Sequence, residues 1–121
     1  MSTKLKLGES GEGTATTAAI GAGLGVKYDA SNPGALVVTG VGDRIIGVTQ
    51  EAIPQNTTGT FWKPRCRAYV SGSGVAAGDL VKCAAAGAFT TESTATTPTV
   101  YTVGQAMTAS DSSNFFDCQF F

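Results

Sequence analysis

The stretch that decides the fold of this chain is Arg67 to Thr91, RAYVSGSGVAAGDLVKCAAAGAFTT. It predicts three short β-strands separated by two turns, because β-favouring residues alternate with runs of glycine, serine and alanine. Apolar residues do not recur at helical spacing without an intervening glycine, so a helix is disfavoured. We interpret the stretch as a pair of hairpins.

The turn in the middle of this stretch has a second copy upstream. Gly42-Asp43 leads into Ile45-Ile46, just as Gly78-Asp79 leads into Leu80-Val81. Glycine tolerates the unusual φ angle of a turn, and the aspartate carboxylate accepts a hydrogen bond from a nearby backbone N–H. One carboxylate per turn supplies too few ligands for calcium. We therefore expect turn chemistry, with no metal and no cofactor.

The composition limits the class of protein. The chain has 121 residues, a net charge of −1, 42% hydrophobic residues and only 14% charged ones, where about 25% charged is typical. Its length fits one domain with a core of its own. A nearly neutral surface favours packing against another protein and disfavours nucleic acid, whose binding needs many Lys and Arg contacts to phosphate. We expect neither a nucleic-acid nor a membrane partner, since no segment has the length of a transmembrane helix.

The cysteines and the N-terminus indicate the compartment. Cys66, Cys83 and Cys118 are odd in number, lack C-x-x-C spacing and lie in strand-like runs. We expect reduced, buried thiols and synthesis in the cytoplasm. The N-terminus has no apolar segment of the secretory type.

Residues 1–25 differ from the rest of the chain. Leu5 and Leu7 alternate with Lys4 and Lys6, as in a short amphipathic strand. The glycine-rich residues that follow have little to bury, which predicts a flexible N-terminal arm over 1–25 and a β-domain over 26–121. Gly21-Ala22-Gly23-Leu24-Gly25 lacks the strand, helix and third glycine of a dinucleotide site, so we do not assign it to phosphate binding.

The β-domain is predicted as a small antiparallel β-barrel or β-sandwich. Turn residues, of which Asn32-Pro33-Gly34 is the clearest group, and a threonine-rich loop over Thr90–Thr99 separate the strands. In the final segment, Phe116, Cys118 and Phe120 share the face that we assign to the core. The predicted strands outside the opening stretch are Val26–Tyr28, Ala35–Thr39, Arg44–Thr49, Thr60–Val70, Val100–Thr108 and Phe115–Phe121.

The only basic cluster surrounds Pro64. In an extended strand Lys63, Arg65 and Arg67 share one face, and Trp62 lies on the other face with Cys66 and Ala68. One interpretation is a solvated strand face over a core tryptophan, and the other is a basic strip that docks on an acidic protein surface. Pro64 cannot donate to a ladder, so the strand is expected to lie at an edge or to bulge there.

Catalytic chemistry has no support in the sequence. The chain has no histidine, which removes the commonest general base and the usual nucleophile pairs. Its nine acidic residues are scattered, and no activating partner for a cysteine is identifiable. We expect a protein that acts through its surface and is not an enzyme.

Several of these segments together resemble the small capsid decoration (cement) proteins of tailed bacteriophages. They are Val75-Ala76-Ala77-Gly78-Asp79-Leu80-Val81, Gly87-Ala88-Phe89, Val103-Gly104-Gln105-Ala106-Met107, the apolar final strand and, upstream, Gly47-Val48-Thr49-Gln50. The resemblance covers roughly 36–121. It implies a compact β-barrel or β-sandwich on the outer surface of a phage head, often a homotrimer, that clamps neighbouring major capsid protein subunits.

These arguments define a candidate interface and one competing function. The interface residues are Lys4, Leu5, Lys6 and Leu7 of the arm and Trp62, Lys63, Arg65 and Arg67 of the basic strip. The alternative is a glycan- or host-receptor-binding β-module of a phage fibre or adhesin. Its mark would be clustered exposed aromatic residues, and only Trp62 and Tyr69 lie close together in the sequence.

Overall fold

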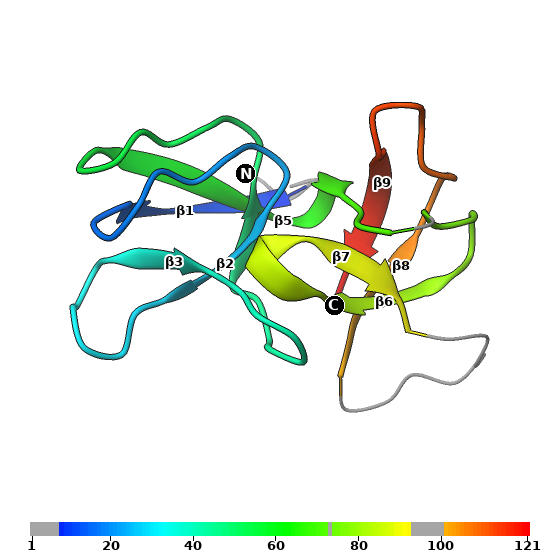
Figure 1. Cartoon of the computed structure of the whole chain (residues 1–121), viewed down its shortest axis with the longest axis horizontal. Coiled ribbons are helices and arrows are strands. Elements are labelled where there is room, and N and C mark those ends of the chain that lie inside the picture. Colours follow the sequence, from blue (N-terminus) through cyan, green and yellow to red (C-terminus); the bar gives the residue numbers. More distant parts are fainter. Residues whose placement is uncertain (1–7, 73, 93–100) are drawn as a thin grey trace, which may run out of the picture.

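The computed structural model describes residues 8–72, 74–92 and 101–121, in which nine strands form one antiparallel sheet (Figure 1). The strands are β1 (Gly8–Thr14), β2 (Gly25–Tyr28), β3 (Leu36–Val38), β4 (Gly47–Thr49), β5 (Thr58–Tyr69), β6 (Leu80–Cys83), β7 (Phe89–Thr91), β8 (Thr102–Ala106) and β9 (Phe115–Phe120). Their order is β3-β2-β4-β5-β9-β8-β6-β7, with β1 paired to β5 beside this path. The predicted all-β antiparallel class is confirmed, and the sheet curls into a half-barrel.

Two hydrophobic cores lie on opposite faces of the β2–β4 pair. Val26 belongs to an N-terminal core with Leu36 and Phe61, whereas Val48 belongs to a C-terminal core with Phe89 and Phe116. Val26 stands across from Gly47, one residue before Val48, and consecutive residues of a strand point to opposite faces. All three residues of β4 are buried, because β4 has a core on each side.

The strand β5 runs from one core to the other and bends at Pro64. Its first part pairs with β1 and β4, and its second part pairs with β9. The Cys66 Sγ lies 3.0 Å from the backbone oxygen of Trp62, whereas four extended residues span about 13 Å. The predicted edge position is wrong, because β5 lies at the centre of the sheet, and Pro64 is accommodated at a bend within the strand.

Trp62 does not take the core position expected of it. Its side chain is 39% exposed, and Phe61 next to it is buried. The bend changes which alternate residues face inward, because Phe61 before the bend and Cys66 and Ala68 after it are all buried. In β9 no such break occurs, and the predicted core face of Phe116, Cys118 and Phe120 is confirmed.

The predicted flexible arm is wrong from Gly8 onward. Residues 8–14 form β1, which pairs with β5 over its whole length. Farther along, the backbones of Ile20 and Ile53 exchange hydrogen bonds of 2.9 and 2.7 Å, and the Ile20 side chain is buried. The part of the arm that carries Lys4, Leu5, Lys6 and Leu7 lies outside the described residues.

Glycine in β1 makes room for large side chains of other strands. A Cβ at Gly11 would overlap the ring of Phe61, and a Cβ at Gly13 would overlap Leu36. The glycines therefore occupy positions that face the N-terminal core, where two bulky neighbours fill the space. The segment β1 has few apolar side chains of its own, but it borders the core because its glycines pack against Phe61 and Leu36.

The two Gly-Asp turns have the same geometry, as predicted. The carboxylate of Asp43 accepts a hydrogen bond from the Gly40 N–H at 2.8 Å, and that of Asp79 accepts one from the Ala76 N–H at 2.9 Å. The intervening Gly42 and Gly78 have φ of 79° and 90°, a region that favours glycine. The threonine-rich loop is only partly seen: Thr90 and Thr91 belong to β7, and 93–100 lie outside the described residues.

We predict that Gly11→Val destabilises the protein by about 1–3 kcal/mol, since the added side chain overpacks the core against Phe61. Denaturant unfolding measures the change. Ser10→Val is the matched control, because Ser10 precedes Gly11 in the same strand and is exposed. Equal stability of the two variants would contradict the packing that we describe.

Candidate interaction surface

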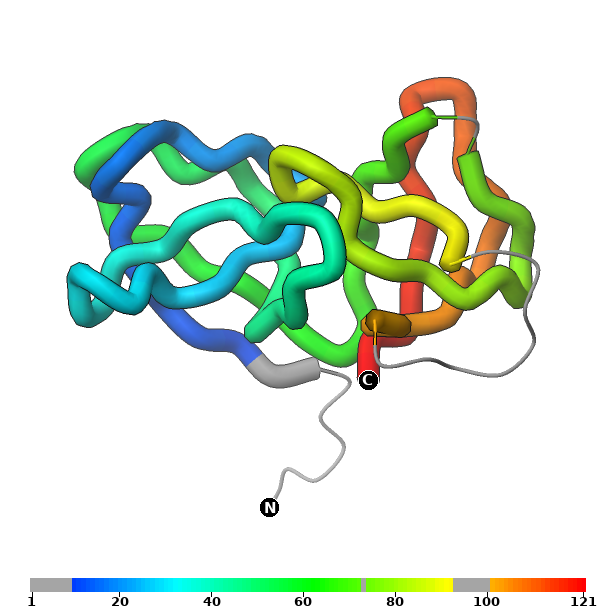
Figure 2. Tube along the Cα trace, turned by 60° about the horizontal axis from the view of Figure 1, so that its bottom comes forward, coloured from blue at the N-terminus to red at the C-terminus, as the bar shows by residue number. Residues whose placement is uncertain are grey.

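The basic cluster lies where three strands meet. Gly8 of β1 stands across from Pro64, and Gln119 of β9 stands across from Arg65. The start of β1 and the end of β9 therefore meet along β5, on the same side of the molecule (Figure 2). Trp62 lies just before the junction, and Phe121, which is 59% exposed, lies just after β9.

Two hollows flank the junction and divide the predicted basic strip. Lys63 lines the first, of about 380 Å³, together with Ser10, Ile46, Phe61 and Pro64. Arg65 and Arg67 line the second, of about 350 Å³, together with Gln50, Cys66, Met107, Asp117 and Cys118. The structure thus brings Arg65 and Arg67 together and places Lys63 in a separate hollow.

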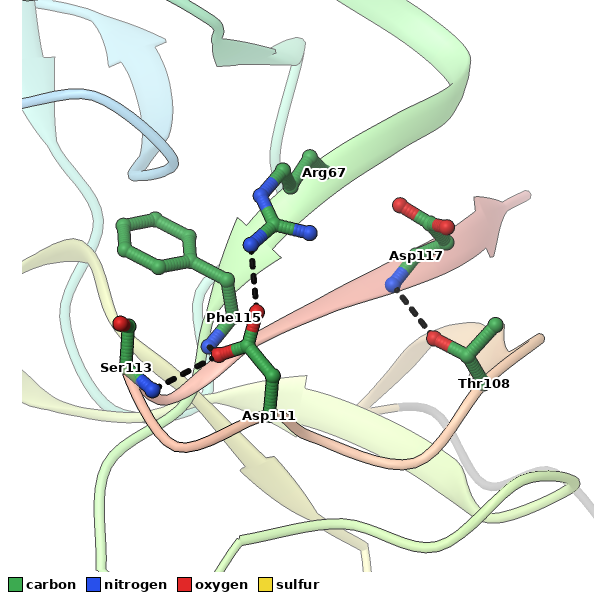
Figure 3. A network of polar contacts seen from close by, with 6 residues as sticks. All are labelled: Arg67, Thr108, Asp111, Ser113, Phe115 and Asp117. Carbon is green, nitrogen blue, oxygen red and sulfur yellow. Dashed lines mark hydrogen bonds and ion pairs between the residues drawn. The ribbon is translucent and has the colours of Figure 1, made fainter.

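Contacts with other residues of the chain fix both the side chain and the backbone of Arg67. Its guanidinium forms an ion pair with Asp111 at 2.5 Å and lies 5.1 Å from the centre of the Phe115 ring (Figure 3). Its backbone N–H donates to Gln50 Oε1 at 3.1 Å, and its backbone oxygen accepts from Gln50 Nε2 at 3.0 Å. These contacts anchor the loop before β9, so Arg67 has a structural role.

Asp111 organises that loop. Besides the Arg67 contact, its carboxylate accepts backbone hydrogen bonds from Ser113 at 2.9 Å and Phe115 at 3.0 Å (Figure 3). The Phe115 hydrogen bond and then the Arg67 contact hold the pKa of Asp111 below its usual value. Each contact favours the ionised carboxylate, which ties β5 to the start of β9.

Arg65 has a different environment. Its side chain is exposed, and its Nε–H donates to Gln119 Oε1 at 3.2 Å. Among the described residues, the ion pairs are Lys27–Asp43 and Arg67–Asp111, so Arg65 forms no ion pair there, although Asp117 lines the same hollow. The side chain of Arg65 therefore contacts a neutral residue, Gln119, whereas that of Arg67 contacts the acidic Asp111.

The sequence did not identify Gln50, Asp111 and Gln119 as part of this surface. No pattern in the sequence indicated that Gln50 or Asp111 contacts an arginine. Asp111 lies 44 residues from Arg67, and Gln119 lies 54 residues from Arg65. No local pattern signals a contact over that separation.

The cysteines are buried free thiols, as predicted. Burial raises the pKa of Cys66 to about 11 and also raises the pKa of Cys83 and Cys118. The thiolate is the reactive form, so these groups are poor nucleophiles near neutral pH. In the described part of the chain, no three His, Cys, Asp or Glu side chains gather as a metal site requires.

The fold and this surface define a small antiparallel β-protein with two open hollows, lined by both polar and apolar side chains, next to the bend in β5. Within the described ranges no helix has the length and apolar character needed to cross a bilayer. No protein-family model matches the chain, and no curated protein matches it significantly.

A solved structure does share the fold. It is the N base of the head fiber protein gp8.5 in bacteriophage phi29, with a TM-score of 0.73. The match covers 95% of this chain and 95% of that chain, at 10% sequence identity. A likeness at this identity shows a common fold.

We predict that all three cysteines resist modification in the native protein and react after denaturation. The physical reason is their burial together with the raised pKa of each thiol. Titration with a thiol reagent at neutral pH, without reductant, measures both states. Rapid labelling of the native protein, or fewer than three thiols after denaturation, would contradict this.

We also predict that Asp111→Ala destabilises the protein most above about pH 5 and less as the pH falls toward 3. The folded-state pKa of Asp111 is lowered, so its contribution is present above the unfolded pKa and is lost on acidification. Thermal unfolding of both proteins across this range measures the difference.

Asp117→Asn is the matched control for the acid dependence. Asp117 is exposed in β9, and its carboxylate accepts no hydrogen bond from the described residues, whereas its backbone N–H donates to Thr108 Oγ1 (Figure 3). A pH-independent loss of stability in Asp111→Ala would disprove the role of the ionised carboxylate.

Proposed function

We propose that this chain is a structural protein of a tailed-phage head, and more specifically a capsid decoration (cement) protein. In this proposal it binds the outer surface of the head and stabilises contacts between major capsid protein subunits. The observation that carries the proposal is the fold shared, over 95% of both chains, with the base of a phage head fiber protein. The sequence segments that resemble cement proteins support it independently.

The surface chemistry suits such a role. The two hollows are open depressions on either side of a bend, and they offer shape and polar groups without a catalytic set among the described residues. A head presents many identical sites, so modest contacts per subunit add up when several copies are linked. We propose the major capsid protein as partner, a homotrimer as the assembled form and the outer surface of the virion as the location.

The same considerations lead us to propose that the chain is not an enzyme and binds neither nucleic acid nor a membrane. Its net charge is −1, and one of the clustered cations, Arg67, is already paired within the fold. Little positive charge therefore remains for phosphate.

A fibre or receptor-binding role is the second candidate, since the structural neighbour is itself a head fiber base. Trp62 and Tyr69, the two aromatic residues that could have stacked on a sugar, do not form a common surface. Tyr69 packs edge-on against Phe115 at 5.5 Å, and no ring contact joins it to Trp62 within the described chain. This makes glycan binding at that pair the weaker proposal.

The test is to mix purified protein with mature, undecorated heads of the virus that encodes it. We expect saturable binding, regularly spaced density on the outer surface by cryo-electron microscopy, and a higher temperature of head rupture. Heads mixed with an unrelated β-protein of similar size and charge are the control. If the protein neither binds nor raises the rupture temperature, the decoration proposal is wrong, and a glycan array would then test the receptor alternative.

A further inference from the structure

The cations of the basic strip differ in what stands across from them. The register places Glu9 opposite Lys63, Gln119 opposite Arg65 and Asp117 opposite Arg67. Arg67 is in addition paired with Asp111. Arg65 is thus the member of the strip whose position across the strands is occupied by a neutral residue.

The contact with Gln119 also orients Arg65. The guanidinium donates its Nε–H to Gln119 Oε1, and neither Nη forms a hydrogen bond with another described residue. Both Nη groups can therefore donate hydrogen bonds to a ligand, and the Gln119 contact fixes the direction in which they point. A planar fork of this kind matches the two oxygens of a carboxylate.

The neighbouring hollow supplies space for a side chain. It measures about 350 Å³, and Gln50, the half-exposed Met107 and Asp117 line it together with Arg65. Met is an adaptable apolar contact, and Gln50 is fixed by its hydrogen bonds to the Arg67 backbone. An acidic side chain that binds Arg65 would pack its methylenes against Met107, and it would share the hollow with the Asp117 carboxylate, which stands across from Arg67.

We infer that Arg65, positioned by Gln119, is a docking point for a carboxylate of the partner protein, an Asp or Glu side chain at the surface of the capsid shell. This inference rests on the proposed capsid-binding function and narrows it to one residue of the strip. Arg67 contributes less because its guanidinium is already paired with Asp111, and Lys63 lies in the other hollow.

The experiment measures the binding of variants to undecorated heads over a range of salt concentrations. Arg65→Gln is expected to weaken the apparent affinity per site about tenfold and to reduce its dependence on salt. Arg65→Lys is expected to fall in between, because an ammonium group cannot form the two parallel bonds of the fork.

Gln119→Glu is the sharpest variant. It keeps the acceptor oxygen that orients Arg65 but places a negative charge beside the guanidinium, so the arginine is neutralised within the chain. We expect it to bind as weakly as Arg65→Gln while remaining folded. Arg44→Gln is the matched control, because it removes the same charge at an exposed arginine of another segment and should bind like the wild type.

The outcomes separate the two proposals. If the wild type does not bind heads, the proposed function fails and this inference fails with it. If the wild type binds and Arg65→Gln binds equally well, or if Arg44→Gln is weakened as much, the inference alone is overturned. Thermal unfolding of each variant identifies a loss that is due to misfolding, and in that case Arg65→Lys and a map of the decorated head decide whether a carboxylate contacts Arg65.

Discussion

The structure depends on the β2–β4 pair, which is buried on both of its faces. Val26 and Gly47 face one core, while Val48 and Gly25 face the other. A small sheet in this situation must use small residues wherever a large side chain from either core approaches: Gly47 lies under the Phe61 ring and Gly25 under Phe89. Tight packing from two sides makes this pair a rigid wall, and β5 is held against it on its way from one core to the other.

Sequence reasoning succeeded where structure is set by near neighbours. The two Gly-Asp turns follow from residues within three positions of each other, and the inward face of β9 follows from simple alternation. It failed for residues 8–25, because the glycines of β1 are explained by Phe61 and Leu36, which lie far along the chain. Without those partners a glycine-rich segment is indistinguishable from a flexible one. Trp62 was misplaced for a related reason, since the bend at Pro64 breaks the alternation on which its assignment depended.

The candidate site was predictable in its residue types and only partly in its organisation. An exposed strip with Arg65 and Arg67 side by side follows from the sequence, and the structure has it. Which cation is already neutralised does not follow, because Asp111 and Gln119 come from another hairpin. The difference matters physically: a paired arginine stabilises its own fold, whereas one held by a neutral amide keeps its charge available to a partner.

A surface with few charges places particular demands on recognition. With 14% charged residues, this chain avoids most of the desolvation cost of burying ions at an interface, but it also has little long-range steering. Contacts in open hollows add buried interface area but do not fix the orientation of the bound partner. That orientation has to come from a small number of directional hydrogen-bonding groups. An exposed guanidinium oriented by its neighbour meets that requirement, because a bidentate contact fixes angle as well as distance. In the proposed role on a phage head, correct orientation would let every copy engage its site, and avidity would supply what a single contact lacks.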